Sequence, residues 1–258
     1  MRAEKIPAHE SRFDNTGKDS AGKKHALIKK SIEIFGEDKF LNYVDIEPAS
    51  GDESYYYRTK FPKDQIVIHY TMGYLKGDIA TLTKHDYHVS VAFVIGRNGT
   101  IYNLFPSAYW SYHLGKGAKG GNGVRSKRSI GIEISNIGPL IRKGNNLATA
   151  YKDRNGNYTD RYCSSDQQEL WEAKPFRGFD FYATQTNQQY ESLIILLRYL
   201  TARYEIPRQF LDENVRYEAS TPNALFNGIV SHVNYRATGK TDIGPAFDWN
   251  RVIEGVTS

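Results

Sequence analysis

The sequence has a single cysteine, Cys163, among its 258 residues. One thiol cannot form an intrachain disulfide or build a zinc site from several cysteines, so disulfide-stapled folds and cysteine-rich zinc modules are excluded. Long apolar runs are also missing, because no stretch approaches the ~18 apolar residues of a transmembrane helix. The N-terminal residues 1–7 lack the apolar core of a signal peptide. We therefore expect synthesis in the cytoplasm and no membrane insertion.

The sequence has little excess of charge of one sign. It contains 34 Lys and Arg residues against 29 Asp and Glu residues, a formal net charge of +5. A small excess spread along the chain permits an anionic partner but selects none. Because no stripe of Lys and Arg alternates with aromatic residues, we do not expect a nucleic-acid partner.

Hydrophobic patterning predicts a domain of the α/β class. The run of β-branched residues from Ile66 to Ile68 ends at the polar His69, as a buried strand does where it reaches a site. Thr186 and Gln189 form a capping box, and the apolar residues that follow at helical spacing end before Pro207. Further strands are predicted over residues 89–95, 101–104 and 129–135, with a hairpin turn at 97–100 between the first two.

Two segments lie outside this pattern, one at the N-terminus and one inserted in the main domain. Residues 1–60 are interpreted as an N-terminal extension that serves docking or delivery, and residues 61–258 as the main domain. The first thirty residues are polar and resemble a loosely ordered arm, whereas Ala26–Tyr43 has a weak helical pattern. The competing interpretation is that this helix packs against the sheet. The main domain contains a polar insertion at about 141–185.

Two histidines and one carboxylate have the context of functional groups. His69 ends an apolar strand, and His232 follows another short apolar run. Lys240 and Asp242 are two residues apart, so in an extended segment their side chains share a face. Two imidazoles and a carboxylate can bind Zn²⁺ and leave a fourth position for water. Their spacing is not a local motif, so only the fold can bring them together.

Four blocks of sequence, in order, resemble the type 2 N-acetylmuramoyl-L-alanine amidases. This family includes T7-type phage lysozyme, the cytosolic anhydromuropeptide amidases and the peptidoglycan recognition proteins. The segment Trp110-Ser-Tyr-His113-Leu-Gly115 is similar to the family's Trp/His/Gly segment beside the substrate. The resemblance covers about residues 65–250. The four blocks are Ile66–Thr71, Val94–Tyr102, Ser129–Ile134 and Ser231–Pro245.

This resemblance implies a single mixed central β-sheet flanked by helices, with a zinc site at one edge of the sheet. It makes His69, His232 and Asp242 the zinc ligands. It makes Glu133 the catalytic carboxylate and Lys240 the group that stabilises the oxyanion. An aspartate as third ligand resembles the anhydromuropeptide branch, because the T7-type branch has a cysteine there.

Ordinary structural roles remain alternatives for the two catalytic candidates. Glu133 could be a solvated strand residue, and Lys240 a plain surface lysine. Apolar residues at 130, 132 and 134 indicate that the strand is central, which favours a functional role for Glu133 on its other face.

The resemblance also implies that Trp110 and His113 contact substrate, although packing is an equal alternative for His113. The chain departs from the family at Val91-Ala92, where a His or Tyr often stands. Whether Tyr87 or His88 replaces it in the site is open.

The implied function is zinc-dependent hydrolysis of the amide bond between N-acetylmuramic acid and L-alanine in peptidoglycan or muropeptides. A wall-lytic enzyme without a signal peptide would reach the wall through lysis, a holin or an injection apparatus. One rival is a non-catalytic peptidoglycan-binding module, but binding-only relatives tend to lose the third ligand, and Asp242 is present. Another is a structural docking component of a phage tail or contractile particle, with residues 1–60 contacting the particle.

Overall fold

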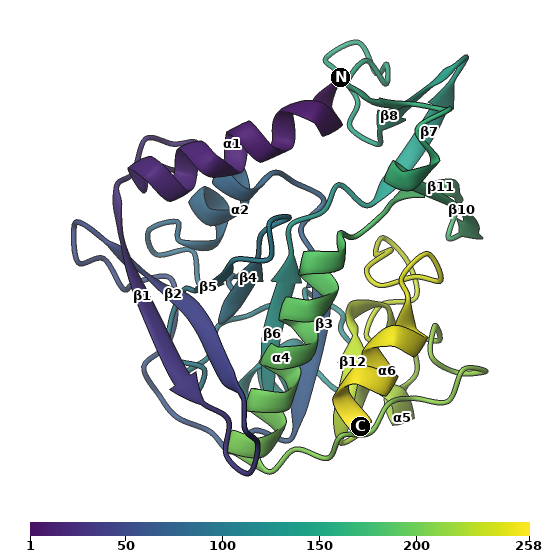
Figure 1. Cartoon of the computed structure of the whole chain (residues 1–258). Helices are drawn as coiled ribbons and strands as arrows, with labels where there is room; N and C mark the ends of the chain where they lie inside the picture. Colours follow the sequence, from purple (N-terminus) through teal and green to yellow (C-terminus); the bar gives the residue numbers. More distant parts are fainter.

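A seven-stranded mixed sheet is the centre of the fold in the computed structural model, which describes residues 1–258 (Figure 1). Its strand order is β1-β2-β5-β4-β6-β3-β12. Strand β3 pairs in parallel with both β6 and β12, and β4 pairs in parallel with β6. The expected α/β class, with helices flanking one mixed sheet, is confirmed. The strands are β1 His25–Glu33, β2 Phe40–Pro48, β3 Gln65–Tyr70, β4 Phe93–Ile95, β5 Ile101–Asn103, β6 Ser129–Ile134 and β12 Gly228–Ser231.

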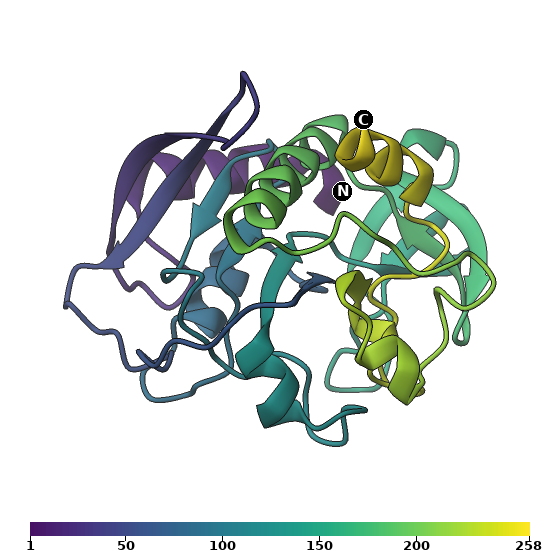
Figure 2. The ribbon, with the colours of Figure 1, turned by 90° about the horizontal axis from the view of Figure 1, so that it is seen from below.

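Helices cover both faces of this sheet. Helices α4 and α6 lie side by side on one face, and α3 lies on the opposite side (Figure 2). Helix α4 begins as its capping box predicts, because the Thr186 hydroxyl accepts the Gln189 backbone N–H at 3.1 Å. None of the helices combines the length and apolar character needed to cross a membrane. The helices are α1 Arg2–Thr16, α2 Leu75–Leu82, α3 Asn122–Arg128, α4 Asn187–Tyr204, α5 Thr221–Ala224 and α6 Trp249–Thr257, with short 3₁₀ turns at Gln168–Leu170 and His232–Asn234.

The strands that carry the candidate site match their prediction closely. Every residue of β3 is buried, as expected for a central parallel strand. In β6, Ile130, Ile132 and Ile134 join the main core, so the alternate residues face the other side of the sheet. The strand predicted at 89–95 is shorter than expected, because residues before Phe93 make only an isolated bridge at Val89.

The helix predicted at Ala26–Tyr43 is wrong. Strands β1 and β2 form an antiparallel hairpin in this region, and β2 continues the main sheet by pairing in parallel with β5. The apolar residues there fit the period of a helix or of a strand. Pairing with β5, which lies far away in the sequence, favours the strand. The docking or delivery role of residues 1–60 stays a prediction.

The loosely ordered arm expected at the N-terminus is also wrong, because α1 is a fifteen-residue helix fastened to the sheet. Glu10 is buried, and its carboxylate accepts the backbone N–H groups of Arg97 at 3.1 Å and Asn98 at 3.3 Å. Phe13 is fully buried and packs edge-on against Tyr102, with ring centroids 5.6 Å apart. Helix α1 therefore covers the turn between β4 and β5.

Glu10→Ala should lower the free energy of unfolding by about 1–3 kcal/mol, because it leaves two backbone donors without a partner in a buried position. Urea denaturation followed by circular dichroism measures this change. The matched control is Glu4→Ala, which changes an exposed carboxylate of the same helix and should alter stability little. Equal stability of both variants would show that Glu10 does not anchor the helix.

The region of the predicted insertion forms a second sheet. Its five strands are all antiparallel, in the order β10-β11-β7-β8-β9, and appear at the upper right of Figure 1. Leu147, Tyr162 and Cys163 are fully buried in a small separate core, to which Ile6 of helix α1 also belongs. The strands are β7 Pro139–Lys143, β8 Asn146–Thr149, β9 Arg161–Ser164, β10 Trp171–Phe176 and β11 Phe179–Ala183.

Candidate metal centre and catalytic cleft

Three neighbouring parallel strands bring the candidate residues to one end of the sheet. His69 lies near the carboxyl end of β3, and Glu133 occupies the matching register position on β6. His232 follows directly after β12, the edge strand beside β3. Because the carboxyl ends of parallel strands meet at the same side of a sheet, these three residues converge there.

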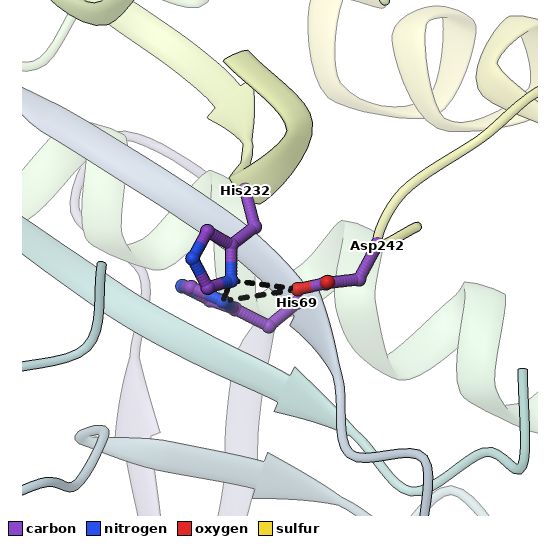
Figure 3. A group of neighbouring side chains, drawn as sticks. All are labelled: His69, His232 and Asp242. Atoms are coloured by element: carbon purple, nitrogen blue, oxygen red, sulfur yellow. Dashed lines mark hydrogen bonds and ion pairs between the residues drawn. The ribbon is translucent and has the colours of Figure 1, made fainter. Parts of the chain in front are cut away.

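His69, His232 and Asp242 form a tight cluster of buried side chains (Figure 3). The Nδ1 atoms of the two histidines are 2.9 Å apart. The Asp242 Oδ2 atom is 2.9 Å from Nδ1 of His232 and 3.3 Å from Nδ1 of His69. Asp242 comes from the loop before α6, so three separate segments supply the cluster.

A chain of hydrogen bonds determines which nitrogen of His69 faces the cluster. The Ser129 hydroxyl donates to the backbone carbonyl of Arg125 at 2.7 Å. The same oxygen can then accept the Nε2–H of His113 at 2.9 Å, which leaves Nδ1 of His113 to accept the Nε2–H of His69 at 3.1 Å. A neutral imidazole has one N–H, so Nδ1 of His69 presents a lone pair to the cluster.

His232 is oriented in the same way. Its Nε2–H donates to the carbonyl of Leu114 at 3.0 Å, so its Nδ1 also presents a lone pair. Metal-bound histidines typically use their second nitrogen in such a bond. Sequence reasoning did not find these partners, since a backbone carbonyl and a serine leave no recognisable signal.

The charges of the cluster favour a bound cation. Burial, reinforced by His232, lowers the pKa of His69 to about 4, so the ring is neutral at neutral pH. The pKa of Asp242 lies below its usual value, so the carboxylate is ionised. Two imidazole lone pairs and one carboxylate oxygen converge without a proton between them. This donor set could hold Zn²⁺, which prefers such ligands.

Glu133 lies beside the cluster with an incomplete set of partners. The side chain is half-buried, and its Oε2 atom is buried with no hydrogen-bond partner. Burial raises the pKa of Glu133 well above its ordinary value, with Asp242 and Asp78 adding to the effect and Lys240 opposing it. A carboxyl group in this setting is suited to exchanging a proton with a bound reactant.

A cleft of about 300 Å³ opens beside His232 of the cluster. His113, His232 and Lys240 line it, together with Val89, Tyr112, Gly115, Lys116 and Asn122. A larger cavity of about 530 Å³ lies between β2, α4 and residues 104–108, but none of the predicted site residues lines it. We place the candidate chemistry at the smaller cleft, because His232 of the cluster, its neighbour His113 and the candidate Lys240 line it.

Trp110 does not line this cleft. Its ring stacks on Tyr57 at 4.3 Å, and the Lys127 ammonium lies 5.0 Å from its centroid. The His88 ring packs against the same tyrosine in a tilted arrangement, with centroids 4.2 Å apart, and Tyr87 is exposed. The structure therefore brings His113 to the cluster but places Trp110 in a neighbouring aromatic group, while the substrate roles predicted for both stay predictions.

Gly131 is a further residue that the site requires. A Cβ atom at this position would lie 2.7 Å from the Val91 side chain and 3.1 Å from Nδ1 of His113. The His113 ring therefore occupies the space above β6 that the missing side chain leaves. The small residues that alternate with isoleucine in this strand were the sequence signal for this space.

Comparison with known proteins adds a family and several similar folds. The profile of the Amidase_2 family, described as N-acetylmuramoyl-L-alanine amidase, matches residues 59–245. Among curated proteins, none is significantly similar in sequence. AmiD from E. coli, solved with anhydro-N-acetylmuramic acid-L-Ala-D-gamma-Glu-L-Lys, is 24% identical with a TM-score of 0.48, and the match covers 77% of this chain and 59% of AmiD.

Two further solved structures are similar at lower identity. AmpDh3 from Pseudomonas aeruginosa, solved with anhydromuramic pentapeptide, is 18% identical with a TM-score of 0.46, and the match covers 77% of this chain and 63% of that one. The endolysin amidase LysCS from Clostridium intestinale URNW is 20% identical with a TM-score of 0.37, and the match covers 74% of this chain and 82% of that one.

The family profile spans most of the chain, including both histidines of the cluster, Glu133, Lys240 and Asp242. The resemblance inferred from the four sequence blocks is thereby confirmed. This chain belongs to the Amidase_2 family of N-acetylmuramoyl-L-alanine amidases.

Proposed function

We propose that this chain is a zinc-dependent enzyme that hydrolyses the amide bond between N-acetylmuramic acid and L-alanine in peptidoglycan or muropeptides. The observation that carries the proposal is the convergence of two imidazole lone pairs and the Asp242 carboxylate next to Glu133. A cleft lined by His232 and Lys240 lies at the same end of the sheet, and it is the proposed entry for the substrate amide.

An amide is a poor electrophile, so its hydrolysis requires a polarised carbonyl and an activated water. Zinc held by His69, His232 and Asp242 would supply both effects, because it is a Lewis acid and lowers the pKa of a bound water to ~7. Glu133 is the proposed proton carrier: its carboxylate accepts the proton of the attacking water and passes it to the leaving amine of L-alanine.

Lys240 is the proposed electrostatic stabiliser of the developing oxyanion. Its side chain lines the cleft, and its positive charge adds to the lowering of the pKa of His69 and opposes the rise in the pKa of Glu133, so it lies within electrostatic reach of both groups. A fixed ammonium group in a partly desolvated cleft stabilises negative charge more strongly than it would in water. His113 supports the centre differently, since it accepts the Nε2–H of His69 and keeps that ring in its ligating tautomer.

Product analysis tests this proposal. Incubation with purified sacculi, or with the muropeptides bound in the similar structures, should release peptides with a free L-alanine amino terminus and leave the glycan intact. Mass spectrometry of the products measures both ends. New reducing sugar ends without new amino groups would instead identify a glycosidase. Binding without any product would favour a non-catalytic peptidoglycan-binding module.

A further inference from the structure

The hairpin of β10 and β11 extends from the second sheet to the loop that carries Lys240 and Asp242 (Figure 1). Arg177 lies at the tip of this hairpin in a left-handed conformation, with a φ angle of +47°. Its neighbour Phe176 packs so closely on Gly244 that a Cβ there would be 2.6 Å from the ring. The insertion and the C-terminal loop are therefore in direct contact.

The Arg177 guanidinium donates hydrogen bonds to several carbonyl groups of this loop. Its Nη1 donates to Arg236 and Lys240, both at 2.6 Å, and its Nη2 donates to Val233 at 3.1 Å. Nη2 also reaches the carbonyl of Tyr217 at 3.4 Å.

The loop is closed on itself around this guanidinium. The Val233 N–H donates to the Asp242 carbonyl at 2.9 Å, which ties the ends of segment 233–242 together. Between them, residues 237–239 are exposed and form no strand or helix. The carbonyls of Arg236 and Lys240 accept no hydrogen bond other than those from Arg177. The guanidinium is therefore the group that holds the middle of the loop.

We propose that Arg177 is a positioning residue for the metal centre, which holds segment 233–242 so that His232, Lys240 and Asp242 converge. A guanidinium is planar and offers five N–H donors, so it can bind three carbonyls at once, whereas a lysine ammonium is a point charge on a flexible chain. Without the guanidinium, the hydrogen bond between Val233 and Asp242 still joins the ends of the segment, but the carbonyls in its middle have no donor. Asp242 and Lys240 then sample more positions, and the metal-binding geometry is populated less.

The inference rests on the proposed function only for its effect on turnover, because its effect on metal affinity can be measured independently. Arg177→Ala should raise the zinc dissociation constant about 10–100-fold, the usual effect of removing a group that supports metal ligands. Competition with a chromogenic chelator measures this constant. Arg177→Lys should show nearly the same loss, although it keeps the charge and the aliphatic stem.

Methylguanidine should restore part of the zinc affinity of Arg177→Ala and none of that of Arg177→Lys, where the lysine fills the space. If Arg177 only stabilised the hairpin, methylguanidine would not restore zinc affinity in Arg177→Ala. Lys174→Ala is the matched control: it removes an exposed cation of the same hairpin that makes no hydrogen bond, and it should leave zinc affinity unchanged.

Wild-type zinc affinity in both Arg177 variants would overturn the inference, and so would a loss that methylguanidine does not reverse. If Arg177→Ala does not fold, the zinc affinity of Arg177→Lys alone tests the inference: a loss supports it, and wild-type affinity overturns it. If the wild-type protein binds zinc but releases no L-alanine peptides, the proposed function fails while the affinity measurements still test Arg177.

Discussion

His232→Ala should remove zinc and turnover together. The wild-type protein, purified without added metal, is expected to contain one zinc ion per chain by elemental analysis. The variant loses one of the three proposed zinc ligands and the imidazole that bonds the Leu114 carbonyl. Because even the removal of a supporting group weakens metal sites 10–100-fold, loss of a ligand should weaken zinc binding by more than ~100-fold. Amide hydrolysis should fall below detection.

The control for this variant is His85→Ala. His85 has 81% of its side chain exposed and forms its hydrogen bonds with Ser54 and Asp52, so its loss should affect neither zinc content nor turnover. Removing the metal from wild-type protein with a chelator should abolish turnover, and added Zn²⁺ should restore it. Full zinc occupancy and activity in His232→Ala would refute the assignment of the metal centre.

Glu133→Gln should lower turnover by ~10²–10⁴-fold while zinc content stays at the wild-type level. Glutamine has the same size but cannot accept the proton of the attacking water. The burial that raises the pKa of Glu133 also shows that its charged form is disfavoured in this position. A neutral amide should therefore leave thermal stability equal or higher. Steady-state kinetics, elemental analysis and thermal denaturation separate these effects.

Glu33→Gln provides the comparison, because Glu33 is an exposed carboxylate in β1, outside the cluster and the cleft. It should match the wild-type protein in all three measurements. Turnover of Glu133→Gln within a few-fold of wild type would return Glu133 to an ordinary role in its strand, and another group would have to carry the proton.

The convergence of His69, His232 and Asp242 was predictable, whereas their role as zinc ligands stays a prediction. His69 lies near the end of a fully buried strand, and His232 follows another, so both were expected at strand ends. Parallel pairing of β3 with its neighbours then brings those ends together. Asp242 was found only through its block of sequence, because nothing in its own surroundings indicates that the loop turns back toward β3.

The groups that orient the two histidines could not be predicted, because no local pattern in the sequence marks them. Ser129 and the carbonyl of Leu114 orient the two histidines through contacts between segments that are distant in sequence. Trp110 shows the converse case: it lies in a segment similar to one beside the substrate, yet its ring packs on Tyr57 outside the cleft. Proximity in sequence to His113 does not determine the direction of a neighbouring side chain.

The N-terminal region shows where periodicity is insufficient. The apolar residues of Ala26–Tyr43 suit a helix or a strand, and the outcome depends on β5, which offers an unpaired edge to β2. Arg177 illustrates the same limit on a smaller scale. An arginine in a polar insertion is typical of a solvated surface, and its role appears only when the hairpin reaches the loop of Lys240.

The sequence by itself was sufficient for the α/β class, the strands β3 and β6, the start of α4, the family and the three residues that the fold brings together, His69, His232 and Asp242. These features depend on the hydrophobic period, the capping residues and the residue types within short segments. Such local patterns do not depend on where the segment lies in the folded chain. Only the tertiary structure decided the pairing of β2, the tautomers of His69 and His232, the place of Trp110 and the contact of Arg177 with the loop. Each of these depends on which distant segments meet, and that is determined by the packing of the whole chain.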